Sequence, residues 1–146
     1  MKWIFGIGIL LLMAACTLNA TQEQALNNGI RLYLKATNEG SILLVASKTH
    51  PAFVKYARSK GIDFFKATFK SEEANEYATS NFTIKETKAK GDQIHVLFEA
   101  VTEDYFSTPV KKQFVAISEN DGVSWFFMPY KDYQNKKICK ELVRLL

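Results

Sequence analysis

The chain has 146 residues, about the length of one domain. Its residues are 47% hydrophobic, 13% aromatic and 23% charged, which is typical of a globular core and excludes a disordered chain. Two cysteines exclude a disulfide scaffold and a four-cysteine zinc site. The formal net charge is +4. Among the residues after residue 15, the excess of positive over negative charge lies in the last segment, which contains Lys131, Lys136, Lys137, Lys140 and Arg144 together with Asp132 and Glu141. A neutral body with a basic tail is unlike the dense basic face of a nucleic-acid module, so we expect no nucleic-acid partner.

The first residues have the layout of a secretory signal. Lys2 is followed by an apolar run from Trp3 to Cys16, and the chain turns polar from Asn19. The run is shorter than the ~20 residues that a membrane-spanning helix needs. We therefore predict a signal peptide over residues 1–15, a tether over 16–21 and a single domain over 22–146.

The end of this apolar run resembles the lipobox of bacterial lipoproteins. Residues 12–16 read Leu-Met-Ala-Ala-Cys, with small residues before a cysteine. The resemblance implies cleavage between Ala15 and Cys16, acylation of Cys16, and anchoring in the cell envelope through that lipid. Thr17 stands where inner-membrane lipoproteins often carry Asp, which favours the outer membrane. The alternative is cleavage after Ala20, which would release a soluble periplasmic or secreted protein.

The N-terminal half is predicted to be helical. Apolar residues recur at helical spacing after Thr21-Gln22-Glu23-Gln24, which has the form of a capping box, and Gly40 supplies a stop. The residue before Pro51 is pushed out of the helical region, while Pro51 itself suits a first helical turn. We expect helices over residues 22–38, 51–57 and 62–70, with a continuation of the last one to Tyr77 as an open extension. Residues 42–46 are expected to begin a further helix or a turn.

The C-terminal half alternates with the period of a strand. We expect strands over residues 82–87, 94–101, 113–119 and 123–128, turns at 90–92 and 120–122, and a loop over 104–109. The fourth strand is apolar on both faces, which predicts a central position in the sheet. After Pro129 we expect a C-terminal amphipathic helix, with Ile138, Cys139 and Leu142 on its apolar side and Arg144 with the lysines on its polar side. Cys139 would then be an inert buried thiol.

Helices followed by antiparallel hairpins predict an α+β fold, with helices packed on one face of a curved sheet. Residues 32–38, the segment 45–53 with its Thr-His-Pro, and the Ser-Trp-Phe-Phe of residues 124–127 resemble small bacterial members of the nuclear transport factor 2-like, cystatin-like α+β superfamily. The resemblance implies a conical fold, with a bent sheet wrapped around helices and often a cavity at its wide end. Because that superfamily includes isomerases, dehydratases and binding modules, it does not decide the function.

No catalytic, metal-binding or cofactor-binding residues are predicted. His95, Glu99 and Glu103 share one side of the second strand but lie ~13 Å apart from neighbour to neighbour, too far for mutual activation. We interpret that side as the solvent face. His50, before Pro51, is expected to bond a local backbone group at a helix entry. No P-loop, dinucleotide fingerprint or nucleophile elbow is present in the sequence.

The function predicted from these patterns is binding without catalysis. The domain would hold a small apolar ligand or an envelope protein, in a pocket for which Tyr33, Tyr56, Phe98 and Trp125 are the expected lining. The alternative is a small cofactor-independent enzyme of the isomerase or dehydratase type that uses the same apolar cavity. Burial of Glu99 or Glu103 beside a tyrosine would favour the enzyme, because burial raises the pKa of a carboxylic acid.

Overall fold

The computed structural model describes residues 17–70, 81–103, 108–138 and 140–146. Cys16 and the signal peptide, the extension to Tyr77, most of the loop over 104–109 and Cys139 lie outside these ranges. The described elements are α1 (Ala20–Asn38), α2 (Ile42–Lys48), α3 (Pro51–Ser59), α4 (Ile62–Phe69), β1 (Asn81–Lys90), β2 (Gln93–Glu103), β3 (Pro109–Ser118), β4 (Phe126–Pro129) and α5 (Tyr130–Gln134). The strands form one antiparallel sheet in the order β1-β2-β3-β4. The predicted α+β class is confirmed.

Helix α1 begins two residues earlier than the sequence predicts. Asn19, and not Thr21, is the N-cap: its side chain accepts from Gln22 N at 2.9 Å, and Gln22 Oε1 accepts from Asn19 N at 3.0 Å. The Gln22 amide also donates to the carbonyl oxygen of Asp121, at 2.9 Å. This contact with the β3–β4 turn explains why the capping box forms at Asn19–Gln22.

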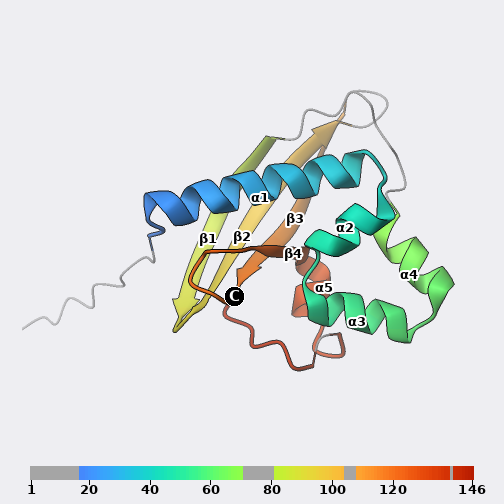
Figure 1. Cartoon of the computed structure of the whole chain (residues 1–146). Helices are drawn as coiled ribbons and strands as arrows, with labels where there is room; N and C mark the ends of the chain where they lie inside the picture. The colour runs from blue at the N-terminus through green and yellow to red at the C-terminus, as the bar shows by residue number, and fades with distance from the viewer. Residues whose placement is uncertain (1–16, 71–80, 104–107, 139) are drawn as a thin grey trace, which may run out of the picture.

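The sheet is covered on both faces over β2–β4, whereas no residue of β1 is buried. Figure 1 shows α1 running across the strands, with α2–α4 gathered at one side of the sheet. Tyr33 of α1 lies 5.6 Å from the Phe114 ring and 5.0 Å from the Phe127 ring, which places α1 on the face of those two side chains. The opposite face carries His95, whose ring lies 5.6 Å from that of Tyr133 in α5. Because α5 and the segment that follows it cover this second face, the core extends to both sides of the strands.

The expectation that residues 123–128 form a central strand is wrong. The strand starts only at Phe126 and lies at the edge of the sheet, where β3 is the one described strand that pairs with it and a single bridge joins Phe127 to Thr49 on its other side. Asp121 (φ 54°) and Gly122 (φ 79°) form the predicted tight turn, and Trp125 Nε1 donates to Gly122 O at 3.1 Å, so residues up to Trp125 belong to the turn. Both faces of β4 are apolar because α1 covers one and the C-terminal segment covers the other.

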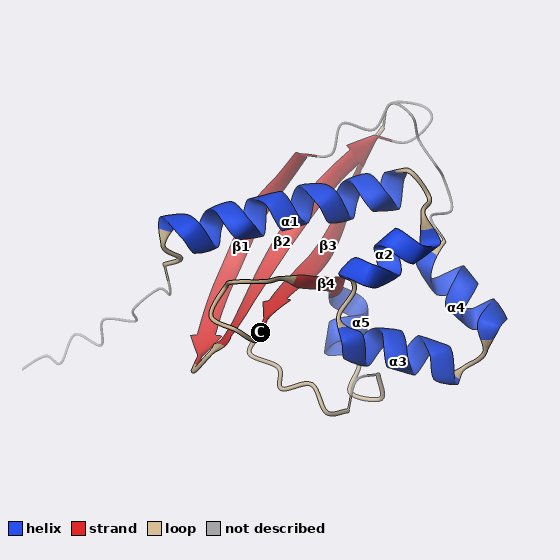
Figure 2. Cartoon of the chain, viewed as in Figure 1, coloured by secondary structure: helices blue, strands red, loops and turns tan. Residues whose placement is uncertain are grey.

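The predicted C-terminal amphipathic helix is also wrong. Helix α5 ends at Gln134, and residues 135–138 and 140–146 form turns and extended chain, drawn as loop in Figure 2. We call residues 135–146 the strap. Ile138 and Leu142 of the strap are buried, as the apolar pattern predicts, while Lys136, Lys137 and Lys140 are exposed.

In the strap, hydrogen bonds between side chains and backbone groups replace the backbone hydrogen bonds of a helix. Arg144, expected on a solvated face, is half-buried and donates to the carbonyl oxygens of Tyr133, Asn135 (3.0 Å) and Ile138 (2.8 Å). The Tyr133 hydroxyl accepts from the backbone N–H groups of Leu145 and Leu146, at 2.8 and 3.1 Å. Tertiary contacts of this kind override a local helical preference.

The interpretation of His95 as a solvent-face residue is wrong as well, because the strap covers it. Its ring is fully buried, with Nδ1 2.8 Å from the Tyr133 hydroxyl. Since that hydroxyl oxygen already accepts two backbone N–H groups, its own hydrogen is donated to Nδ1. The ring proton of His95 is therefore on Nε2, which has no hydrogen-bond partner in the described part of the chain.

Over the described residues, no helix is both long and apolar enough to cross a membrane. The longest helix, α1, is amphipathic, with Leu26, Ile30 and Leu34 buried and Arg31 and Lys35 exposed. Its apolar side packs on the sheet.

Candidate functional site

A cavity of about 950 Å³ lies around the outer edge of β3, bordered by α2–α4 on one side and by α5 on the other. Its volume is within the range of small-molecule pockets, ~300–1,000 Å³. Lys112 and Phe114 line it from one face of β3, and Lys111 and Gln113 line it from the opposite face. A cavity lined from both faces of a strand must pass the edge of that strand, so the first half of β3 is open on this side.

Aromatic side chains form the helical wall of the cavity. The Phe53 and Tyr56 rings of α3 stack at 6.4 Å, Tyr56 meets Phe64 of α4 edge-on at 6.1 Å, and Phe53 meets Phe69 at 5.9 Å. Spacing along the chain produces this wall, because Phe53 and Tyr56 lie three residues apart and so share one side of α3. Phe64 is 43% exposed, so part of the aromatic wall is accessible to a ligand.

The charged lining is mostly basic. It consists of Lys70, Lys111, Lys112 and Lys131 against Glu99 and Asp132. Glu99 is only 16% exposed and lies between two lysines, with Lys85 Nζ at 3.5 Å and Lys111 Nζ at 3.6 Å. Because these two ion pairs offset the charge of Glu99, the remaining charges leave the cavity with a net positive potential.

Burial alters the acidity of Asp132 and of Tyr33 in the cavity lining. Burial raises the pKa of the Asp132 carboxyl above its usual range, although the neighbouring Lys131 lowers it in part. Burial also raises the pKa of the Tyr33 hydroxyl, and the negative charge of Asp132 raises it further. Tyr33 therefore stays protonated at all ordinary pH and acts in this cavity as a hydrogen-bond donor or acceptor.

Two of the four predicted pocket residues line the cavity. Tyr33 and Tyr56 do so, whereas Phe98 and Trp125 do not. Phe98 is fully buried in the sheet core, where its ring stacks on Phe114 at 5.5 Å, and the Trp125 indole lies in the β3–β4 turn. Both are core residues, because the cavity opens at the edge of β3 and not over the middle of the sheet.

Sequence reasoning missed most of the lining. The lysines of β3 and the acidic Asp132 come from segments whose proximity depends on strand register and on the position of α5. Phe53 and Phe64 carried a weak signal, since apolar residues at helical spacing are usually core. Only the exposure of Phe64 distinguishes it from the core, and exposure is not visible in the sequence.

The other candidate groups give no catalytic arrangement in the described residues. His50 caps α3 as predicted: its Nδ1 accepts from Ala52 N at 3.3 Å, and its Nε2 lies 3.2 Å from Glu119 Oε1. Glu99 is held by lysines and no tyrosine bonds to it, and the side chain of Glu103 lies outside the described part. No three metal-ligating side chains gather within the ranges that the structure covers.

The comparisons with known proteins assign no family. No protein-family model matches the chain, and no curated protein matches it in sequence. The shape, lining and charge of the cavity and the N-terminal sequence pattern are therefore the features that bear on the function.

Proposed function

We propose that this protein is a lipid-anchored lipoprotein of the bacterial cell envelope whose domain binds a small amphipathic ligand without catalysis. The observation that carries the binding function is the cavity of about 950 Å³ with an aromatic wall facing a basic rim. The pattern of residues 12–16 supports lipidation at Cys16, and Thr17 supports the outer membrane.

The chemistry of the lining indicates the kind of ligand. The aromatic wall of α3 and α4 stabilises an apolar or aromatic body, because burying apolar surface contributes ~25 cal/mol per Å². Lys70, Lys112 and Lys131 favour an acidic group on the same molecule. Tyr33 also lines the cavity, and its hydroxyl supplies a hydrogen bond for orientation.

A cofactor-independent enzyme of the isomerase or dehydratase type is the second candidate. One observation favours it: Asp132, a carboxyl whose pKa is raised by burial, lies in the cavity with Tyr33. Lys131 beside Asp132 opposes that pKa shift, and Glu99 is neutralised by its lysines, so a second acid or base is missing among the described lining residues. Asp132→Asn separates the two functions, because it would abolish turnover by an enzyme and leave a binding module able to bind.

The nuclear transport factor 2-like cone is proposed as the fold family. It is supported by the long first helix across the sheet, by the short helices that follow, and by the antiparallel order of the strands. The cavity lies at the part of β3 that extends beyond β4, and the C-terminal strap covers the opposite face of the sheet, which are departures from a simple cone with one cavity inside it.

The proposed binding function is tested with an amphipathic anion. Residues 17–146 contain every described element, so this fragment is titrated with 8-anilinonaphthalene-1-sulfonate and the fluorescence is recorded. Phe64→Ala is expected to weaken binding ~5-fold, as expected for loss of an aromatic contact worth ~1 kcal/mol. The matched control is Ile62→Ala, an exposed apolar residue of the same helix that does not line the cavity. Equal affinities of the two variants would refute the cavity as the site.

A further inference from the structure

Strand β3 extends beyond its shorter neighbour β4. It pairs with β2 along its whole length, from Pro109 to Ser118, but with β4 only from Phe114 to Ile117. At Pro129 the chain leaves the sheet and enters α5 at Tyr130. Among the described residues, no strand pairs with the outer side of residues 111–113.

The direction of the backbone groups on this edge follows from one hydrogen bond. Phe127 O accepts from His50 N at 3.0 Å, so the Phe127 carbonyl points away from β3. Since successive residues of a strand direct their polar groups to opposite sides, Phe126 and Met128 bond to Ile117 and Val115 of β3. Continuing the same alternation along β3 places the N–H groups of Gln113 and Lys111 on the outer side. No backbone carbonyl of the described ranges outside β2 accepts from these two groups, which leaves them to a further strand.

The edge is accessible and basic. Lys111, Lys112 and Gln113 are exposed, and all three line the cavity that passes this edge. Lys70 and Lys131 add two more positive charges to the same lining. Lysine on an open edge opposes pairing between identical edges, because like charges would face each other across the new pair. The complement of this edge is therefore an extended chain that carries negative charge.

We propose that the open edge of β3 binds an acidic, extended peptide segment by strand addition, with Lys111 and Gln113 forming the backbone hydrogen bonds. Alternate side chains of such a peptide point to opposite faces, so one set lies on the face of Lys112 and Phe114 and the other on the face of Lys111. This inference rests on the proposed binding function, since it uses the same cavity, and it names the class of partner.

The test uses the full mature protein in neutral detergent and a fluorescein-labelled peptide of alternating glutamate and valine. Fluorescence polarisation measures its binding. Two further peptides carry N-methyl groups, one on the glutamates and the other on the valines. Because an edge strand bonds through alternate residues only, one methylated peptide is expected to lose at least ~10-fold in affinity while the other stays within ~2-fold. Equal affinities for both methylated peptides, or no binding of the parent peptide, would overturn the proposal.

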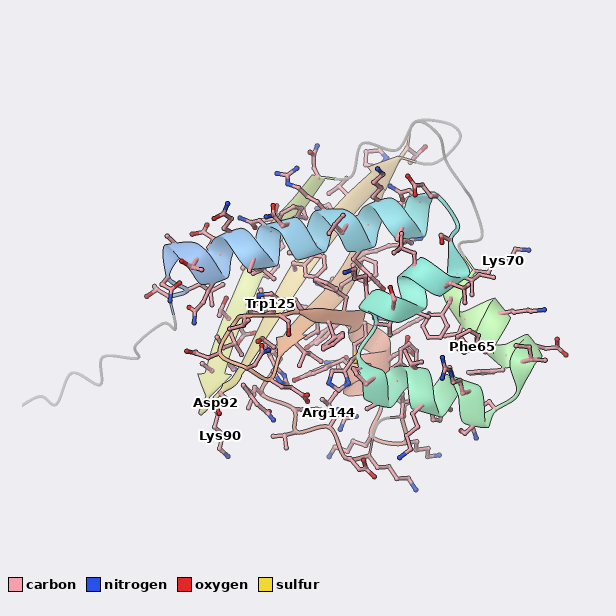
Figure 3. All side chains as sticks on the ribbon, in the orientation of Figure 1. Phe65, Lys70, Lys90, Asp92, Trp125 and Arg144 are labelled. Atoms are coloured by element: carbon pink, nitrogen blue, oxygen red, sulfur yellow. The ribbon has the colours of Figure 1, made fainter. Side chains whose placement is uncertain are left out.

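Protein variants provide an independent arm. Lys112→Glu is expected to weaken peptide binding at least ~5-fold, since it reverses one charge on the cavity rim. The matched control is Lys90→Glu: Figure 3 shows Lys90 at the β1–β2 turn, far from Lys70 at the end of α4. Lys90→Glu should leave the affinity for the peptide unchanged. An equal loss of affinity in both variants would show that only the net charge of the protein matters, and would refute recognition at this edge.

Two further outcomes are decisive. Hydrogen exchange of the Lys111 and Gln113 amides should slow at least ~10-fold in the complex, while that of Val115, already bonded to β4, should not change. Formation of a dimer through this edge would overturn the proposal in favour of a second copy of the chain. If the peptide fails to bind but 8-anilinonaphthalene-1-sulfonate binds with the expected dependence on Phe64, the strand-addition inference is refuted and the small-ligand function stands.

Discussion

The burial of His95 makes the stability of this protein sensitive to acid. Burial of the ring, together with the nearby His50, lowers the pKa of His95 from 6.5 to about 4, although Glu119 raises it in part. The Tyr133 hydroxyl donates to Nδ1, and Nε2, which carries the ring proton, has no described partner. A second ring proton would bind at Nδ1, where it would face the hydrogen that the Tyr133 hydroxyl donates. Protonation therefore costs free energy in the folded state but not in the unfolded chain.

The sign and size of the effect follow from the two pKa values. Because the folded-state pKa is the lower one, the unfolded chain binds more protons between pH 6.5 and about 4. The contribution of His95 to stability is fully present above pH 6.5 and is lost as the pH falls toward 4. At ~1.36 kcal/mol per pKa unit, the loss between pH 7 and pH 4 is roughly 3 kcal/mol.

The assay is urea unfolding of wild type and of His95→Leu from pH 7 to pH 4. Carboxylates titrate in both proteins, so the difference between the two stability curves isolates His95. We expect this difference to change by roughly 3 kcal/mol across the window, with wild type losing more. If His95→Leu does not fold, the ring is titrated in wild type by NMR, and its midpoint should lie well below 6.5. Parallel stability curves, or a midpoint near 6.5, would refute the reasoning.

Four more expectations can be measured. Arg144→Ala should destabilise the fold by ~2 kcal/mol in urea unfolding, because it removes a charged donor from the strap carbonyls, whereas Lys140→Ala, at an exposed position of the strap, should have little effect. Arg144→Lys should restore little of that stability, since an ammonium cannot span the same acceptors. Gly29→Ala should destabilise the fold by ~1 kcal/mol although alanine has the higher helix propensity, because the new Cβ would lie 2.9 Å from Cζ of the buried Phe127 ring. The control Asn28→Ala, on the exposed side of the same helix, should not destabilise the fold. Cys16→Ser should abolish lipidation and membrane partitioning, and an intact mass starting at Thr21 in wild type would contradict the lipobox interpretation.

The parts of the fold that local signals determine were predictable. Helical spacing with a capping pattern locates α1 within two residues, and Pro51 marks the start of α3. The turn at Asp121 and Gly122 was predicted from residues that tolerate positive φ, and both adopt it. In these segments the residues that decide the conformation are neighbours in the sequence.

The wrong predictions share one physical cause, which is contact between distant segments. The spacing of Ile138, Leu142 and Leu146 fits a helix, but it also fits a strap that buries a side chain at intervals. Arg144 and the Tyr133 hydroxyl favour the strap over the helix, because they form hydrogen bonds with its carbonyl and N–H groups. The same strap explains His95, because a polar residue on an alternating strand indicates solvent only when nothing covers that face.

Helix α5 connects the two features that the sequence did not reveal. Asp132 lies in the cavity, whereas the adjacent Tyr133 is fully buried beneath the sheet and holds the end of the strap. A short helix of this kind has few contacts of its own, so the position of Asp132 depends on how firmly Tyr133 is held. Substitutions that loosen the strap, such as Arg144→Ala, should therefore also weaken binding in the cavity, although Arg144 does not line it. Unchanged affinity in a destabilised Arg144→Ala protein would show instead that the cavity wall is set by β3 and by α3–α4 alone.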